Sequence, residues 1–232
     1  MTLIWATQIN DKWTLVVDSA VTIWQVMTDT LDGYRPKLRE IKGKNVTLIT
    51  AGCGAIKDVD FVLNIVENKL ANRKFKSTND LKFFLQETVS NAHRELKTLT
   101  DDPQEAFIFL EPKTNTLWIV DEYSITEPKF CANIAMGSGE QMFYKARKHN
   151  DFFSAFIHAV ECDAYCDFPV VSYRDGELNT WYWYGPKEDN RFYSLGHTNE
   201  PEEKLCSYWW EVPEVDPKWR RAYICDWTSK TL

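Results

Sequence analysis

Two residues near the start of the sequence are of types that can carry chemistry, a hydroxyl and a carboxylate. Thr2 directly follows Met1, and Asp18 closes the second of two apolar runs in MTLIWATQINDKWTLVVDSAVT. A threonine hydroxyl is a weak nucleophile unless a base takes its proton. If Met1 is removed, the free α-amine of Thr2, with an ordinary pKa of about 7.7–8.0, can take that proton directly or through one water. Each residue alone has a plainer interpretation, because threonine is common at position 2 and Asp18-Ser19 can form a simple strand-end turn.

The pattern around these residues predicts two β-hairpins in the first part of the chain. β-Branched and apolar residues dominate 2–9 and 13–17, on either side of a turn at 10–12. The block VTLITAG (46–52) is a continuous apolar run, typical of a strand covered on both faces. We expect a short strand at 21–28, a loop over 29–36 and the second hairpin over 37–52, with its turn at 42–45.

Two helices are predicted next, because the apolar spacing changes to that of a helix. Apolar residues recur at i, i+3, i+4, i+7 and i+11, and they are Val59, Val62, Leu63, Val66 and Leu70. The residues at 72–75 break this helix, and a second one begins near Ser77 with Asp80 as its capping partner. His93, on the second helix, and His158, on a later one, are expected to be surface groups or hydrogen-bonded core groups.

Strands and helices alternate again in the second half of the sequence. Strands are predicted in EAFIFLEP, TLWIVDEY and CANIAMG, helices at 140–147 and 151–162, and a last hairpin in FPVVSYRDGELNTWYWYG. The order is therefore strands, two helices, strands, two helices, strands. This order suits an α+β fold with four layers, an αββα sandwich of helices, sheet, sheet and helices.

The composition changes from about residue 190 onward. The last part of the chain has three prolines and four tryptophans, in HTNEPEEKLCSYWWEVPEVDPKWRRAYICDWTSKTL. We predict one domain over 1–189 and a Trp-rich C-terminal extension over 190–232. Its tryptophans suit an interface with a partner, where aromatic residues are favoured, or packing back onto their own domain.

Six short segments occur in the order found in one family of hydrolases. Thr2 heads the first strand and Asp18-Ser19 closes the second. KLREI begins at Lys37, ITAGCGA ends a strand in a small-residue turn, MGSGEQM leads into the third helix and CDAYC follows the fourth. Over roughly residues 2–185 the sequence resembles the N-terminal nucleophile (Ntn) hydrolases, and within them the proteasome β-subunits and the HslV-type peptidases. The resemblance implies their four-layer fold.

The resemblance also implies roles around a threonine nucleophile. Lys37 would depress the pKa of the Thr2 amine and help the hydroxyl to ionise, with Asp18 as its ion-pair partner. The backbone N–H of Gly52, or of its neighbour Cys53, would bind the oxyanion that forms when an amide carbonyl is attacked. The implied supports of the terminal amine are Ser138, Asp163 and Cys166, the last in place of a serine. Threonine is small enough to permit removal of the initiator residue, so no propeptide is required.

Each implied residue has a plainer interpretation when it is taken alone. Taken alone, Lys37 is more typical of a solvated strand residue. The glycines are typical of connections between a strand and a helix, and Asp163 is typical of a helix cap. Ala20 stands where proteasome subunits commonly carry arginine, and the Trp-rich tail has no counterpart in the short bacterial peptidase. A catalytically silent, proteasome-like assembly or binding module that uses the tail as an interface is therefore the alternative. A third hypothesis keeps the enzyme but gives it a small amide as substrate.

Composition excludes several other classes of protein. The formal net charge of −7 argues against a nucleic-acid partner. Cys162 and Cys166 are four residues apart, but no further ligands have zinc-site spacing, so we predict no metal and no cofactor. No apolar stretch approaches the roughly 20 residues that span a bilayer, and the first residues lack the basic start of a secretory signal. We expect a cytoplasmic protein without a membrane partner.

The sequence as a whole thus predicts a threonine endopeptidase that cleaves peptide bonds through an acyl-enzyme ester on Thr2. The resemblance implies a peptide or unfolded protein as substrate and a homo-oligomeric ring, with the helix pair over 56–96 at the ring contacts. It leaves room for an ATPase partner.

Overall fold

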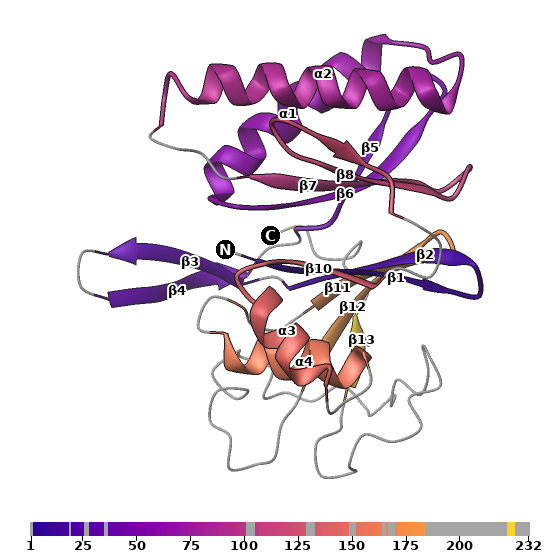
Figure 1. Cartoon of the computed structure of the whole chain (residues 1–232). Helices are drawn as coiled ribbons and strands as arrows, with labels where there is room; N and C mark the ends of the chain where they lie inside the picture. Colours follow the sequence, from indigo (N-terminus) through magenta and orange to yellow (C-terminus); the bar gives the residue numbers. More distant parts are fainter. Residues whose placement is uncertain are drawn as a thin grey trace.

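The chain folds into four layers, which Figure 1 shows as two helices, a sheet, a second sheet and two further helices. The computed structural model describes residues 2–18, 20–25, 28–34, 37–100, 105–128, 133–148, 152–163, 166, 170–183 and 222–225. All strand pairs in both sheets are antiparallel within these residues. The predicted αββα sandwich is confirmed.

The first sheet is built around the N-terminal hairpin. β1 (Leu3–Ile9) pairs with β2 (Lys12–Asp18), and the turn between them places Asn10 and Asp11 at φ values of 50° and 61°. Asparagine and aspartate tolerate this left-handed backbone, which suits a two-residue hairpin turn. The sheet order is β10-β1-β2-β11-β12-β13, with β10 at Asn133–Gly137, β11 at Val170–Arg174, β12 at Glu177–Trp183 and β13 at Ala222–Cys225.

The second sheet has the order β5-β6-β7-β8-β9. Its central strand β7 (Ala106–Glu111) lies between β6 (Thr47–Cys53) and β8 (Thr116–Val120). The two edges are β5 (Arg39–Lys42) and the short β9 (Ile125–Thr126). The hairpin predicted over 37–52 is confirmed as β5 and β6.

Each sheet has a helix pair on its outer face. α1 (Ile56–Asn72) and α2 (Thr78–Leu96) cover the second sheet, and the five apolar residues predicted for one face of α1 are all buried. α2 begins at Ser77, whose hydroxyl accepts the Asp80 N–H, as the capping pattern predicts. α3 (Glu140–Ala146) and α4 (Phe152–Cys162) cover the first sheet.

Alternation along the strands produces three apolar layers. Leu3 and Trp5 of β1 pack toward α3 and α4, whereas Ile4 and Ala6 face the second sheet. In β7, likewise, Phe107 and Phe109 pack against α1 and α2, while Ile108 and Leu110 face the first sheet. Full burial of such side chains contributes roughly 1.5–3 kcal/mol each, so the layers hold the two sheets face to face.

One segment differs from the prediction. The loop expected over 29–36 is wrong at 29–34, because β4 (Thr28–Tyr34) pairs with β3 (Ala20–Gln25) in a separate two-stranded sheet. The register shifts between Val21 and Thr22, where the partner strand contains Asp32 and Gly33. These two residues are turn formers, and here they accompany a β-bulge rather than a loop. The short β9 was not predicted either.

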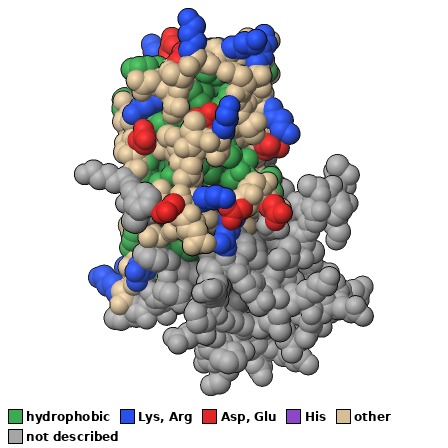
Figure 2. Space-filling view, turned by 90° about the vertical axis from the view of Figure 1, so that its right-hand side faces the viewer, with side chains coloured by type: hydrophobic (Ala, Val, Ile, Leu, Met, Phe, Trp, Pro, Cys, Tyr) green, Lys and Arg blue, Asp and Glu red, His purple; other side chains and the backbone are tan. Residues whose placement is uncertain are grey.

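The C-terminal extension is described only at β13, which pairs with β12 from Ala222 to Cys225. Residues 184–221 and 226–232, with all four tryptophans of the extension, lie outside the described residues. Among the described helices, none combines the length and the apolar character that a bilayer span requires. Over the described face in Figure 2, acidic and basic side chains are interspersed with apolar ones.

Candidate functional site

The seven residues that the resemblance implies all lie among the described residues, and six of them belong to two groups of contacting residues. Thr2, Asp18 and Lys37 form one buried group at the open end of the β1–β2 hairpin. The Ser138, Asp163 and Cys166 contacts form a second group, joined to the first through the Thr2 carbonyl. Gly52 lies on β6, in the facing sheet.

Asp18 connects the backbone at Thr2 to the Lys37 ammonium. The hairpin register pairs Ile4 with Val17 and so brings Leu3 beside Asp18. The Leu3 N–H donates to Asp18 Oδ1 at 2.8 Å, and Lys37 Nζ donates to Asp18 Oδ2 at 2.9 Å. Asp18 is 0% exposed and Lys37 is 6% exposed. The solvated lysine of the plainer interpretation is therefore wrong.

Burial is the largest influence on the Asp18 carboxyl, and it raises the pKa of that group. The charge and the hydrogen bond of Lys37, and then the Leu3 N–H, act in the opposite direction. Both oxygens of Asp18 act as acceptors in these contacts, which fits an ionised carboxylate paired with an ammonium. A buried pair of this kind leaves an uncompensated charge if either partner is removed.

The turn after β10 holds Thr2 from the other side. The Ser138 N–H donates to the Thr2 carbonyl at 2.9 Å. Gly137, which pairs with Leu3, has a φ of +103°, and a Cβ at this position would lie 1.8 Å from the Thr2 oxygen. No side chain fits in that space, so the close approach requires glycine. The predicted Gly-Ser-Gly turn is thus in contact with the backbone of Thr2.

A short hydrogen-bond chain continues from Ser138. Ser138 Oγ lies 3.7 Å from Cys166 Sγ, and the Cys166 thiol donates to Asp163 Oδ2 at 3.2 Å. Burial raises the pKa of Cys166, and the Asp18 and Asp163 charges raise it further. Cys166 is therefore a thiol and not a thiolate, so it serves as a hydrogen-bond donor. The three residues to which the resemblance assigns a supporting role are thus in contact, and the role itself stays a prediction.

The end of β6 faces this group from the second sheet. β5 pairs with β6 only as far as Thr50, so Ala51, Gly52 and Cys53 have described pairing on the β7 side alone. The Cys53 Cβ lies 3.4 Å from the point where a Cβ on Gly137 would be. This short separation brings the end of β6 next to the turn that holds Thr2. Gly52 and Cys53 both stay candidates for the oxyanion donor.

Sequence reasoning missed two features of the site. The first is the Leu3 N–H, a backbone group that no residue type reveals, although the hairpin pattern fixes its place opposite Asp18. The second is the environment of His93: it was expected to be a surface group or a hydrogen-bonded core group, but it is 1% exposed and neither ring nitrogen has a hydrogen-bond partner among the described residues, so that expectation is wrong. His158 is exposed, as one of the two expectations for it allows.

Comparison with known proteins finds likeness in structure alone, since no family model and no curated protein matches the sequence. The Anbu complex of Pseudomonas aeruginosa, solved as a helical assembly, has a TM-score of 0.58 at 12% identity, over 83% of this chain and 90% of that one. HslV of Trypanosoma brucei has a TM-score of 0.51 at 17% identity, over 74% and 97%. BPH of Thiobacillus denitrificans, in complex with epoxomicin, has a TM-score of 0.53 at 15% identity, over 74% and 96%.

These structures identify the fold. The two antiparallel sheets with a helix pair on each outer face form the proteasome-like Ntn-hydrolase fold. The chain spans at least 90% of the length of each of the three proteins.

Proposed function

We propose that this chain is a threonine-type peptidase, an Ntn amidohydrolase that uses Thr2 as its nucleophile after Met1 has been removed. One observation carries the proposal: a buried lysine–aspartate pair is hydrogen-bonded to the backbone beside Thr2. Buried charges are costly and uncommon in a protein core, and perturbed charged groups of this kind cluster at catalytic sites. The likeness in fold to HslV and BPH supports the same reaction class.

The reaction would begin with proton transfer from the Thr2 hydroxyl to its own α-amine, directly or through a water. The hydroxyl oxygen then attacks the carbonyl carbon of a peptide bond, and the carbonyl oxygen becomes an oxyanion. The Lys37 ammonium favours the ionised hydroxyl by its charge, and Asp18 keeps that ammonium in place. The proton passes to the leaving amine, and an ester remains on Thr2. Water hydrolyses this ester and restores the hydroxyl.

The oxyanion requires a fixed donor, and we assign it to a backbone N–H at Gly52 or Cys53. The argument is that β6 continues past the end of β5 at these residues and lies next to Gly137. Gly52 itself is tightly packed, since a Cβ there would lie 2.7 Å from Val59 Cγ1 and 2.9 Å from the Phe107 ring. A tightly packed turn suits the role, because an oxyanion donor must be in place before the reaction begins.

Substrate and assembly follow from the same reaction class. We propose peptides or unfolded proteins as substrates and a homo-oligomer as the working form, with room for an ATPase partner. The helical assembly of the Pseudomonas aeruginosa Anbu complex supports self-association. On this chain the helix pair α1–α2 is the proposed contact surface, and Phe83 of α2, 70% exposed, is an apolar group that such a contact would cover.

The experiment combines intact mass with a covalent probe. The mass shows whether Met1 is absent, and epoxomicin, with which BPH was solved, should add its mass once to the wild-type chain. Thr2→Ala should abolish both this adduct and peptide hydrolysis, whereas Thr98→Ala, at an exposed threonine after α2, should leave both unchanged. Hydrolysis that persists in Thr2→Ala would remove Thr2 from the mechanism.

One observation favours the silent assembly module as the second candidate. Thr2 is only 2% exposed in the structure, so its hydroxyl is not accessible to a substrate in this conformation. If purified protein retains Met1 and takes up no probe, the buried lysine–aspartate pair is structural and the chain is a binding module. A small amide as substrate would instead give probe labelling without hydrolysis of longer peptides.

A further inference from the structure

The strand β7 supports the proposed oxyanion turn residue by residue. Phe107 pairs with Gly52, and Ala106 pairs with Cys53 and accepts its thiol hydrogen bond at 3.4 Å. Glu105, just before β7, packs on Gly54, where a Cβ would lie 2.8 Å from Glu105 Cγ. Gly54 has a φ of +135°, so its backbone conformation is one that other residues rarely adopt. The first residues of β7 therefore determine the position of the turn at 52–54.

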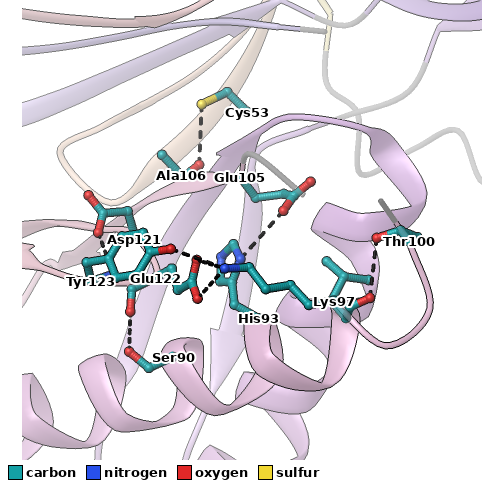
Figure 3. A network of polar contacts seen from close by, with 11 residues as sticks. Cys53, Ser90, His93, Lys97, Thr100, Glu105, Ala106, Asp121, Glu122 and Tyr123 are labelled. Carbon is teal, nitrogen blue, oxygen red and sulfur yellow. Dashed lines mark hydrogen bonds and ion pairs between the residues drawn. The ribbon is translucent and has the colours of Figure 1, made fainter. Parts of the chain in front are cut away.

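His93 of α2 contacts this support at two residues, Phe107 and Glu105, and Figure 3 shows the contact with Glu105 from close by. Its ring meets the Phe107 ring edge-on, with a centroid separation of 6.0 Å and an interplanar angle of 74°. Its Nδ1 lies 3.7 Å from Glu105 Oε2, and both side chains are buried. Residues 105 and 107 are two apart along the strand, which is why one imidazole reaches both.

The separation of 3.7 Å between His93 and Glu105 is longer than a hydrogen bond. The two groups would have to move closer together to form a hydrogen bond or a tight ion pair. Burial lowers the pKa of His93, Glu122 raises it, Lys97 lowers it and Asp121 raises it. Lys97 and Glu122 are themselves paired at 2.7 Å, so their opposite charges largely offset each other at the ring. At neutral pH the imidazole is therefore uncharged.

We propose that His93 and Glu105 form a proton-sensitive support for the turn at Gly52–Gly54. When His93 is neutral, Glu105 stays packed on Gly54 and the turn is held in place. Protonation of His93 draws the Glu105 carboxylate toward the ring to form an ion pair, moves it off Gly54 and loosens the turn. His93 and Glu105 are positioning residues, since neither reaches Thr2 in the described contacts. The link to catalysis rests on the proposed function, because it assumes that this turn carries the oxyanion donor.

The movement of the turn can be measured without any activity. Ala51–Gly52 and Cys53–Gly54 are the only Ala-Gly and Cys-Gly pairs in the sequence. Labelling with ¹³C-carbonyl alanine or cysteine together with ¹⁵N-glycine therefore selects each amide in turn. In a pH titration of the wild-type protein, we expect both amide shifts to follow the inflection of the His93 ring. In His93→Gln these inflections should vanish, and in His158→Gln, at the exposed histidine, they should persist. If the two amide shifts show no inflection at the pH where the His93 ring titrates, the inference is overturned.

The pH profile of hydrolysis then tests the catalytic consequence. The Thr2 amine must be deprotonated, so every active variant has one acid limb with a tenfold loss of kcat per pH unit. Below the pKa of His93 the wild type should become steeper, approaching a hundredfold loss per pH unit, with KM unchanged. In His93→Gln the loss of kcat should stay tenfold per pH unit over the whole acid range, and His158→Gln should have the wild-type profile.

The amide titration and the pH profile of hydrolysis together distinguish a failure of this inference from a failure of the proposed function. If hydrolysis depends on Thr2 but the profile of His93→Gln equals that of the wild type, the inference fails and the peptidase stands. If the amides follow His93 but no Thr2-dependent hydrolysis is found, the peptidase fails and the coupling of His93 to the turn stands.

Discussion

Asp18 has more influence on this structure than its size suggests, because each of its oxygens accepts a different donor. One bond fixes the backbone beside Thr2, and the other fixes the Lys37 ammonium. Burial raises the pKa of Asp18, so the carboxylate depends on these two donors to stay ionised. One side chain thus links the backbone beside Thr2 to the charge of Lys37.

We expect Asp18→Asn to lower the free energy of unfolding by about 3–5 kcal/mol, because it leaves the Lys37 ammonium buried without an anionic partner. Urea unfolding checks this. Asp175→Asn is the matched control: Asp175 pairs with Lys12 on the surface, with side chains 47% and 64% exposed. An exposed pair contributes at most about 1 kcal/mol. Equal, small losses in both variants would contradict a buried ion pair at Asp18.

Gly137→Ala tests the close approach of two backbones at Thr2. Gly176 provides the comparison, since it also has a left-handed φ, +94° against +103°, but its Cβ would meet nothing within 4 Å. Gly176→Ala should therefore cost about 1–2 kcal/mol for the backbone conformation alone. Gly137→Ala should cost several kcal/mol more and abolish hydrolysis, because the new methyl group overlaps the Thr2 oxygen. Similar losses in thermal unfolding for the two variants would argue against this steric requirement.

At the scale of elements, one turn joins the two sheets away from Thr2. Asn115, in the β7–β8 turn, accepts the Trp13 N–H at 2.9 Å and donates to the Asp11 carbonyl at 2.6 Å. Its φ of 53° is one that asparagine tolerates. The β1–β2 hairpin is thereby fastened to the second sheet at its closed end, while Asp18 and Lys37 hold its open end.

Asn115→Gly keeps the backbone conformation and removes both side-chain bonds. We expect a loss of about 1–3 kcal/mol in the free energy of unfolding, since each bond contributes roughly 0.5–1.5 kcal/mol. Asn115→Asp retains the acceptor and the tolerance of this φ, so it should lose only part of that amount. Denaturant melts of the two variants give the comparison. If Asn115→Gly is as stable as the wild type, the turn does not fasten the sheets.

Elements with a strong local signal were predictable from the sequence, and those that depend on a distant partner were not. The apolar period fixed α1, and Ser77 with Asp80 fixed the start of α2. β4 was missed because Asp32 and Gly33 suit a turn, and only the pairing with β3 makes the segment a strand. The order of the motifs predicted the residues of the candidate site, and the structure brings six of the seven together, while their catalytic roles stay predictions. The His93–Glu105 contact did not, because nothing in the spacing of residues 93 and 105 indicates that a helix end packs on the start of β7.

At the scale of the whole molecule, strand pairing connects the two segments on either side of the proposed boundary at residue 189. β13 belongs to the extension by sequence, yet it forms the edge of the first sheet beside β12. The backbone of β12 at Thr180–Trp183 is paired on that side by β13. The extension and the sandwich therefore share a sheet.

A chain truncated after residue 189 should retain the four layers but expose β12 as an edge. Unpaired strand edges recruit other chains, so we expect more self-association than in the full chain. Sedimentation of both chains at matched concentration measures this. A truncated chain that sediments like the full one would show that β13 does not protect the edge, and would favour 190–232 as a separable extension.

The hairpin register described above has a consequence for insertions. Neighbouring residues of a strand point to opposite faces, so a one-residue slip turns every side chain of β2 over. If one codon added between Asn10 and Asp11 shifts the register of β2 by one residue, it turns the Asp18 carboxylate away from the Leu3 amide and the Lys37 ammonium. A variant with this shifted register would keep the Asp18 and Lys37 side chains but lose the contacts between Asp18 and its two donors. The length of the β1–β2 turn therefore affects whether the Asp18 carboxylate and the Lys37 ammonium, at the opposite end of the hairpin, can form their ion pair.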